Sequence, residues 1–153
     1  MKVRSQKASE RRAVCPEEVA FVDLVRTCDL LSRAPARLLK IEDLSGTQYN
    51  VLRILRGSPE GLPCGEIASR MITRDPDVTR LLDRLEKRRW ITRRRESKDR
   101  RMVVARITHE GLKVLARLDE PVEELHRKQL GHMGKNRLLA LAEMLAAART
   151  AVA

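Results

Sequence analysis

The sequence has few aromatic residues, few cysteines and no long apolar run. Among its 153 residues only Phe21, Tyr49 and Trp90 are aromatic, too few for a surface on which several bases stack, as RNA-binding proteins use. No apolar run approaches the roughly 20 residues that cross a bilayer. The basic N-terminus lacks the apolar segment of a secretory signal. We therefore expect a cytoplasmic protein that does not enter a membrane.

The cysteines and histidines do not form a recognisable framework or metal motif. Three cysteines at wide spacing, an odd number, suit reduced thiols in a cytosol rather than disulfides. The three histidines have neither helical i, i+4 spacing nor adjacent cysteines, so we expect no metal site. No phosphate loop, nucleophile elbow or His-Glu metal motif is present. The sequence therefore predicts neither an enzyme nor a bound cofactor.

Basic charge is abundant and concentrated. The net charge is +11, and residues 70–106 alone carry fourteen basic and six acidic side chains. Residues 1–12 carry five basic and one acidic, whereas the remaining segments are close to neutral. A focused basic patch attracts a polyanion, usually nucleic acid. An anionic membrane is the alternative, which we disfavour because the basic segment reads as a helix plus a hairpin rather than one amphipathic anchor.

The first half of the chain predicts an arm followed by three helices. Residues 1–13 are polar and basic and predict a flexible arm. Pro16 followed by two acids opens a long apolar helix in which Pro35 predicts a kink or a break. Thr47 is a good N-cap for a second helix, Gln48–Arg56. A short third helix is expected over about Cys64–Met71, with Cys64 at the capping position.

The sharpest helix start in the chain is Asp75-Pro76, which predicts a helix over Pro76–Arg88. Apolar residues then recur at i, i+3, i+4 and i+7, so that one face packs while the other presents arginines. These apolar residues are Val78, Leu81, Leu82 and Leu85.

The pattern changes to a hairpin after this helix and then returns to helices. Two strands, Ile91–Arg93 and Met102–Ile107, are expected around a loop over Arg94–Arg101. Thr108 caps a long helix, His109–Gln129, that Pro121 should interrupt. A last helix is expected over Lys135–Arg149. Short helices followed by a hairpin predict a mainly α winged helix-turn-helix fold with a two-stranded β-wing, and the long terminal helices suit pairing with another copy.

Several of these segments resemble the MarR family of bacterial transcription regulators, from about residue 20 to residue 149. The helix expected over Pro76–Arg88 matches the family's TRLxDRLE pattern. The loop of the hairpin carries the family's Asp-x-Arg signature at Asp99 and Arg101, and Ile107–Gly111 matches the start of the family's next helix. Residues 44–49 resemble the start of the family's second helix. Arg89 departs from the family pattern, in which glycine takes a left-handed conformation that costs arginine energy, and Gly134 replaces the usual cap of the last helix.

The resemblance implies a single domain over 14–153, with dimerisation helices at 14–43 and 108–153 and a winged helix-turn-helix at 44–107. It implies a homodimer that binds a pseudo-palindromic site in double-stranded DNA, as a repressor released by a small-molecule effector. Asp99 and Arg101 would hold the shape of the wing. The candidate DNA-binding residues are Arg74, Asp77, Thr79, Arg80, Arg84, Arg94, Arg95, Lys98, Asp99, Arg100 and Arg101.

Each assignment has a simpler alternative. Arg84 could pair with Asp83 or Glu86 on a solvated face instead of meeting DNA, and the wing could be an ordinary charged hairpin. Asp77 could cap the helix, orient Arg80 or Arg74, or accept a hydrogen bond from cytosine. For the effector pocket, the candidate wall residues are Phe21, Tyr49 and Leu52, each of which could instead be plain core.

Cys15 is a candidate redox sensor, because peroxide-sensing members of the family use a cysteine near the start of the first helix. A helix N-terminus favours the reactive thiolate, whereas Glu17 and Glu18 oppose it. The aromatic partners of that subgroup are not found near Cys15. The sequence leaves open the operator, the effector, the direction of regulation, the redox role of Cys15 and the role of the basic arm.

Overall fold

The computed structural model describes residues 15–95 and 102–150, which form parts of two compact units divided between Ser32 and Arg33. In the first unit the described chain is helix α1, Pro16–Leu39, which continues into the second unit. The predicted arm over residues 1–13 lies outside the described residues. Of the helices in the described ranges, none is long and apolar enough to cross a bilayer.

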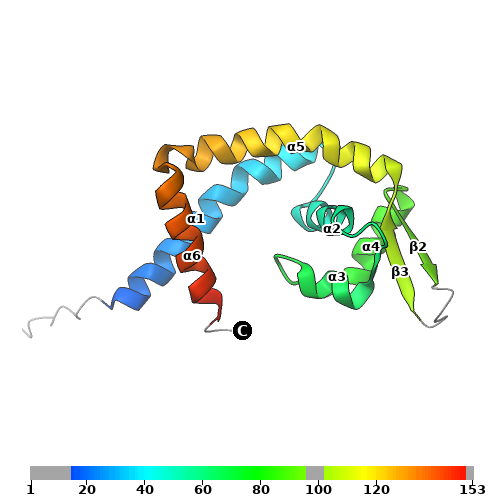
Figure 1. Ribbon diagram of the computed structural model, residues 1–153, viewed down its shortest axis with the longest axis horizontal. Coiled ribbons are helices and arrows are strands. Elements are labelled where there is room, and N and C mark those ends of the chain that lie inside the picture. Colours follow the sequence, from blue (N-terminus) through cyan, green and yellow to red (C-terminus); the bar gives the residue numbers. More distant parts are fainter. Residues whose placement is uncertain (1–14, 96–101, 151–153) are drawn as a thin grey trace, which may run out of the picture. The chain divides into compact units, whose positions relative to one another are not determined.

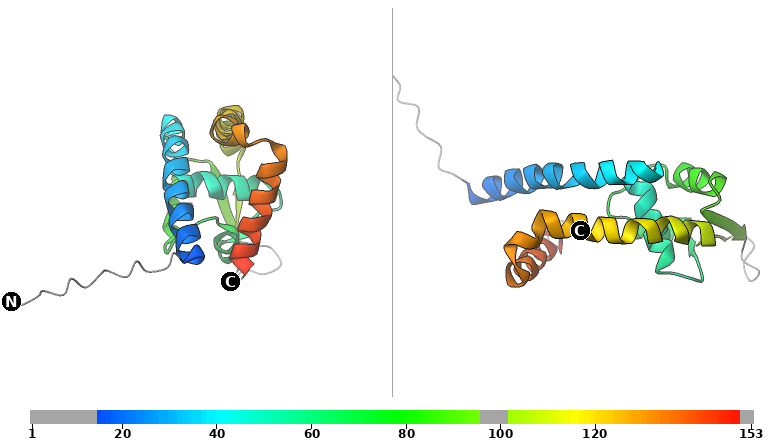
Figure 2. Two further views of the ribbon diagram at one scale, coloured as in Figure 1. Left: turned by 90° about the vertical axis from the view of Figure 1, so that its left-hand side faces the viewer. Right: turned by 90° about the horizontal axis from the view of Figure 1, so that it is seen from above.

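The two prolines that were expected to interrupt helices do not do so. Helix α1 continues past Pro35, and helix α5, His109–Leu130, continues past Pro121, as the unbroken ribbons in Figure 2 show. The predicted interruption at Pro121 and the break offered for Pro35 were therefore wrong. One proline removes a single backbone donor, and the hydrogen bonds of the neighbouring turns are enough to keep a long helix continuous.

The second unit contains a helical cluster, a small sheet and two further helices (Figure 1). The 3₁₀ turn η1, Lys40–Glu42, leads to α2, Gly46–Arg56, then to α3, Cys64–Arg70, and to α4, Val78–Lys87. The hairpin consists of β2, Ile91–Arg95, and β3, Val103–Ile107, and α5 follows it. A 3₁₀ turn, η2, Gly131–Met133, separates α5 from α6, Lys135–Thr150. The predicted mainly α fold with a β-wing is confirmed.

The sheet has one strand more than the sequence predicted. Strand β1, Leu62–Pro63, pairs antiparallel with β3, with Leu62 opposite Ala105, and the strand order is β1-β3-β2. Two residues are too few to show an alternating pattern, so no pattern in the sequence indicated this strand. Gly61 precedes it at φ 82°, where a Cβ would lie 2.6 Å from the Ala105 carbonyl oxygen. Only glycine fits this approach.

The caps of two helices differ from those predicted. Ser45, not Thr47, caps α2: its Oγ accepts from the Gln48 N–H at 3.1 Å, and Gln48 Oε1 accepts from the Ser45 N–H at 2.9 Å. This reciprocal capping box outcompetes a single threonine hydroxyl. The N-cap of α3 is Pro63, without a side-chain hydrogen bond, so Cys64 is already helical.

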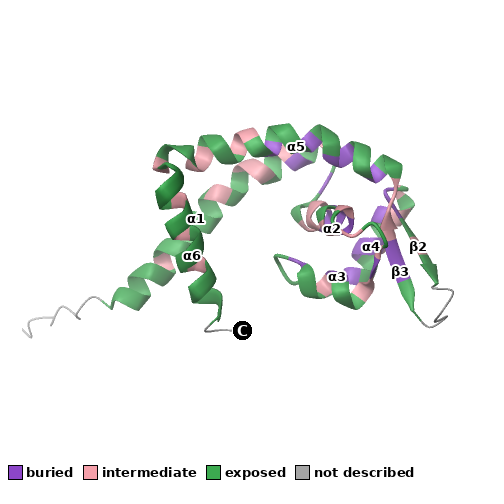
Figure 3. Ribbon diagram, viewed as in Figure 1, coloured by how far each residue is buried: buried purple, intermediate pink, exposed green. Residues whose placement is uncertain are grey.

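The core gathers on α2, α4, the sheet and the first half of α5, where Figure 3 shows the buried positions. The apolar spacing predicted on α4 is confirmed, because all four of its apolar positions are buried. In contrast, α6 has no buried residue, and Leu39 is the one buried residue of α1.

The turn that follows α4 is held against the start of α5. Arg89 has φ 60°, so it adopts the left-handed conformation that glycine takes in the family pattern. Thr108 Oγ1 donates to the Arg89 carbonyl oxygen at 2.7 Å and accepts from the Gly111 N–H at 3.1 Å, so it caps α5 as predicted. A Cβ on Gly111 would lie 2.3 Å from the Trp90 carbonyl oxygen. The turn after α4 therefore packs backbone against backbone on the start of α5.

Candidate nucleic-acid interface

Helix α4 begins two residues later than the sequence predicted. Asp77 is its N-cap, with Oδ1 accepting from the Arg80 N–H at 3.0 Å. Asp75 instead forms a turn in which its Oδ1 accepts from the Asp77 N–H at 2.9 Å. Both aspartates can cap, and the turn at Asp75 leaves the capping position to the second of them. The prediction that Pro76 is the first helical residue was wrong.

The outer face of α4 is basic and exposed. The Arg80 side chain is 76% exposed, and its Nε lies 3.4 Å from Asp77 Oδ2. Thr79 and Lys87 are exposed too, and Arg74 is exposed in the segment between α3 and α4. Asp77 thus both caps the helix and contacts Arg80. Such a face can meet phosphates or the edges of bases.

Arg84 does not pair with the two acids that the sequence offered as partners. It is exposed, and within the described part of the chain it has no ion-pair partner. Asp83 and Glu86 are taken instead by Arg93 from strand β2. The simpler alternative for Arg84, pairing with Asp83 or Glu86, is therefore wrong.

Arg93 joins the helix to the wing, and sequence reasoning missed it. Its Nε donates to Glu86 Oε2 at 2.9 Å, its backbone N–H donates to Glu86 Oε1 at 2.8 Å, and its guanidinium also bonds Asp83. The side chain is only 24% exposed. Burial alone would lower the pKa of Arg93, but the hydrogen bonds to Glu86 and Asp83 outweigh it and raise that pKa. One arginine thus fixes the angle between α4 and β2.

Arg88 anchors the C-terminal end of α4. Its guanidinium donates to the carbonyl oxygens of Asp43 at 2.6 Å and Glu42 at 3.1 Å. It also lies over the Trp90 ring, 3.6 Å from the centroid, a stacking that guanidinium groups favour. Neither Arg88 nor Arg93 is therefore free to meet a ligand, and both serve to position the helix.

The wing is described only at its base. Arg94 and Arg95 lie in β2 rather than in the predicted loop, opposite Val104 and Val103. Both are exposed and have no ion-pair partner within residues 15–95 and 102–150. The strand extends further than predicted because its arginines carry long aliphatic stems and face a β-branched partner strand. The remaining wing candidates lie outside the described residues: Lys98, Asp99, Arg100 and Arg101.

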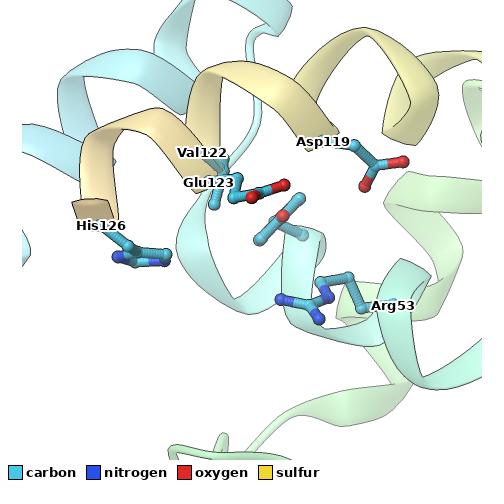
Figure 4. Close-up of a pocket in the computed structure, with 6 residues that line it drawn as sticks. Arg53, Asp119, Val122, Glu123 and His126 are labelled. Carbon is cyan, nitrogen blue, oxygen red and sulfur yellow. The ribbon is translucent and has the colours of Figure 1, made fainter. Parts of the chain in front are cut away.

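A pocket lies between α2 and α5 in the second unit (Figure 4). Its volume is about 360 Å³, and its walls are Tyr49, Arg53, Asp119, Val122, Glu123 and His126. Of the three predicted wall residues, Tyr49 lines it. Leu52 is fully buried in the core and is not a wall residue of this pocket, and Phe21 is 66% exposed on the part of α1 that belongs to the first unit.

The acids of this pocket are already neutralised by arginines outside it. Asp119 accepts from Arg56 Nη1 at 2.8 and 2.7 Å, and Glu123 accepts from Arg127 Nη2 at 2.7 Å. Arg53, 5.8 Å from the Tyr49 ring centroid, has no carboxylate partner in the described part of the chain. The pocket therefore offers an unpaired cation beside an aromatic ring, which suits an organic anion.

Cys15 is exposed, and its thiol donates to Glu17 Oε2 at 2.9 Å. This hydrogen bond lowers the pKa of Glu17. The thiol therefore contacts an acid in the first turn of α1, and the redox role of Cys15 stays a prediction. Among residues 15–95 and 102–150, no cluster of three His, Cys, Asp or Glu side chains could hold a metal ion.

Taken together, a three-helix cluster, a helix with a basic outer face and a hairpin braced against it define a winged helix-turn-helix protein. The family model for the MarR family matches residues 44–103. A crystal structure of a MarR transcription factor from Planctomyces limnophilus is 38% identical, covers 88% of this chain and 98% of its own, and superposes with a TM-score of 0.67. The chain therefore belongs to the MarR family of winged-helix transcriptional regulators.

Two further proteins agree with this assignment. The HTH-type transcriptional regulator FarR of Neisseria gonorrhoeae is 26% identical over 125 residues, 82% of this chain and 85% of the relative. Sco3205, a MarR family regulator from Streptomyces coelicolor solved in complex with DNA, is 24% identical. The match covers 93% of this chain and 91% of Sco3205, with a TM-score of 0.79, and shows the shared fold.

Proposed function

We propose that this regulator binds a pseudo-palindromic site in double-stranded DNA as a homodimer, with α4 of each copy in the major groove. The observation that carries the proposal is the exposed basic face of α4, which is braced on one side by Arg93 and on the other by Arg88. A rigid helix can hold arginines where they meet base edges. The face consists of Arg80, Arg84 and Lys87, flanked by Arg74 and Thr79.

The wing and the acidic cap have defined parts in this proposal. Arg94 and Arg95 meet the backbone of the adjacent groove, and Lys98 and Arg100 enter the minor groove, with Asp99 and Arg101 holding the shape of the wing. Asp77 keeps Arg80 in place through the 3.4 Å contact. Since phosphate contacts set register and base contacts set sequence, Arg80 is the residue that should specify sequence.

The dimer is supported by apolar surface that the chain leaves uncovered. On α1, Phe21 is 66% and Leu30 is 62% exposed; on α6, Met144 is 62% and Leu139 is 55% exposed. Apolar patches of this kind are favourable once a second copy covers them. We propose that α1 and α6 form the dimer interface, which sets the separation of the two α4 helices.

The pocket beside Arg53 is our candidate effector site. Its paired acids and unpaired Arg53 favour a small organic anion, and Tyr49 gives an aromatic ring to stack on. We propose that such a ligand releases the protein from DNA, so that the protein acts as a repressor. An Arg53→Gln variant should keep DNA affinity but need at least about tenfold more of an aromatic carboxylate for release. Equal release of both proteins would rule out this pocket.

The DNA-reading role is tested with Arg80→Ala. Duplexes selected from a random pool by the wild-type protein serve as the probe in fluorescence anisotropy at fixed salt. Loss of a base contact should weaken binding to a selected duplex about 10- to 100-fold, with little change for random duplex. Lys128→Ala, which removes one positive charge from an exposed position on α5, is the control and should bind as the wild type does. A variant that binds both duplexes with unchanged affinity would refute the assignment.

A further inference from the structure

Beside α4 lies a basic hollow that shares one residue, Arg84, with the proposed DNA-binding face. It has a volume of about 540 Å³ and lies where η1, the start of α2 and the end of α4 come together. The residues of this hollow are Lys40, Asp43, Leu44, Ser45, Gln48, Arg84 and Arg88. Three of them are cationic and one is acidic. Its charge therefore favours an anion.

Of the three cations of the hollow, one is bound to other groups of the protein and two have no ion-pair partner among the described residues. Arg88 is committed to the carbonyl oxygens of Glu42 and Asp43 and to the Trp90 ring. The acid, Asp43, lies 3.3 Å from Arg88 and is 96% exposed. Lys40 and Arg84 are exposed and have no ion-pair partner in the described part of the chain. Lys40 and Arg84 are therefore available to bind an anion, whereas the one acid, Asp43, already lies beside Arg88.

Gln48 adds a neutral donor from the base of the hollow. It is the one buried polar residue of the described core, 9% exposed. Its Oε1 accepts from the Ser45 N–H at 2.9 Å, which turns the amide so that its NH₂ group has no hydrogen-bond partner among the described residues. An amide donor without a hydrogen-bond partner, beside two unpaired cations, suits an oxyanion.

The position of the hollow identifies its occupant. Arg84 belongs to both the hollow and the exposed face of α4, and on the helix it lies opposite to the side that Asp83 and Glu86 turn to the wing. A helix in the major groove has a phosphate backbone on each flank. We infer that the wing flank and this hollow are the two backbone contacts of α4, and that Lys40 and Arg84 clamp one DNA phosphate. This inference rests on the proposed DNA-binding function and adds a second backbone site to it.

The test uses the full chain and duplexes selected by the wild-type protein, with binding measured over a range of KCl concentrations. Lys40→Gln should lower the slope of log affinity against log salt by about 0.9 for each protomer on the duplex, and affinity at 0.15 M salt by about fivefold per protomer. The affinity for selected and for random duplexes should fall by the same factor, because a phosphate contact carries no sequence information. Lys128→Gln, which removes an exposed lysine from α5, is the control and should leave the slope unchanged.

A neutral methylphosphonate placed at single positions of the duplex then locates the phosphate. At one position it should weaken the binding of the wild-type protein more than Lys40→Gln does, because it removes the contacts of both Lys40 and Arg84. At that position it should weaken the binding of the Lys40→Gln variant by a smaller factor than that of the wild type, because only Arg84 is left to lose. An unchanged salt slope for a folded Lys40→Gln protein overturns the clamp while leaving DNA recognition by Arg80 intact. The clamp is also overturned if inorganic phosphate binds the wild type but not the Lys40→Gln variant, while the two proteins have the same salt slope for DNA binding. If the wild type shows no preference for any duplex, the proposed function itself fails.

Discussion

Helices α4 and α6 belong to the same unit but differ in what they bury and in the surface that they leave exposed. The ten residues of α4 bury four apolar side chains, and its remaining surface is basic. The sixteen residues of α6 bury none, and its exposed side chains include Leu139 and Met144. The partner that each helix lacks therefore differs in chemistry. A basic face lacks a polyanion, and an apolar face lacks another protein surface.

The same contrast explains why the ion pairs are placed where they are. Around α4, Arg93 and Arg88 tie the helix to β2 and to η1, so its face is held at a fixed angle. No comparable interhelical ion pair involving α6 is found in the described residues. A surface that reads DNA needs rigid support from its own chain, whereas a surface that pairs with a copy gains its support on association.

The largest expected effect comes from the core under α4. Leu85 is fully buried, so Leu85→Ala should lower the free energy of unfolding by about 2–5 kcal/mol. Chemical denaturation at one protein concentration measures this. Leu139→Ala on α6, at a position that is 55% exposed in the single chain, is the contrasting variant. At a protein concentration low enough to separate the copies, it should cost far less. Equal losses would mean that α4 and α6 are packed alike, which would break the comparison.

A charge on α6 should separate the copies without unfolding the chain. Leu139→Glu places a carboxylate in the proposed dimer interface, where burial without a partner is costly. Sedimentation velocity should show the dimer dissociation constant raised at least about tenfold. The helix content of the chain should be retained. A variant that dimerises as tightly as the wild type would exclude this face of α6 from the interface.

Arg93 and Arg94 are neighbours with opposite expected effects. Arg93→Gln leaves Asp83 and Glu86 without their cation, so it should reduce the free energy of unfolding by about 1–2 kcal/mol. Its DNA affinity should fall while the salt slope stays unchanged, because Arg93 positions α4 without touching phosphate. Arg94→Gln should alter stability by less than about 0.5 kcal/mol but lower the salt slope by about 0.9 per protomer. If Arg93→Gln lowered the salt slope and Arg94→Gln lowered the free energy of unfolding, the roles assigned to the two arginines would have to be exchanged.

The smallest effect concerns the ion pair of Arg117 with Glu42, which ties α5 to η1 at 2.7 Å. The hydrogen bond from Arg117 lowers the pKa of Glu42 below 4.5. The pair therefore stabilises the fold fully above about pH 4.5, and this stabilisation is lost as the pH falls through the lower pKa of the folded state. Arg117→Gln should lower Tm at neutral pH by at most about 3 °C. The Tm values of the two proteins should converge once the pH is below the folded-state pKa of Glu42, and a Tm difference that is independent of pH would contradict this account.

Local patterns predicted the fold well because its elements are strongly periodic. The apolar spacing on α4 and the cap at Thr108 both follow from a few neighbouring residues. The errors arose where several short-range solutions competed, as at Asp75 and Asp77 for the start of α4. Strand β1 was missed because its two residues become a strand only through pairing with β3.

The candidate site was predicted in part for a related reason. Exposed arginines on α4 follow from the helical period, but the partner of Asp83 and Glu86 lies seven to ten residues away on a strand. The i, i+3 and i, i+4 spacing of helices could not suggest it. The alternation of β2 was the available signal, since it turns Arg93 to the face opposite Arg94. The pocket at Arg53 likewise depends on the packing of α5 on α2, which no single segment specifies.

The most direct test of the central claim is the affinity of the wild-type protein for its selected duplex relative to random duplex at one salt concentration. If the braced basic face of α4 reads sequence, the selected duplex should bind at least about 10³-fold more tightly. Equal affinities that share the same steep salt dependence would show that the face recognises phosphate alone, and would contradict the account.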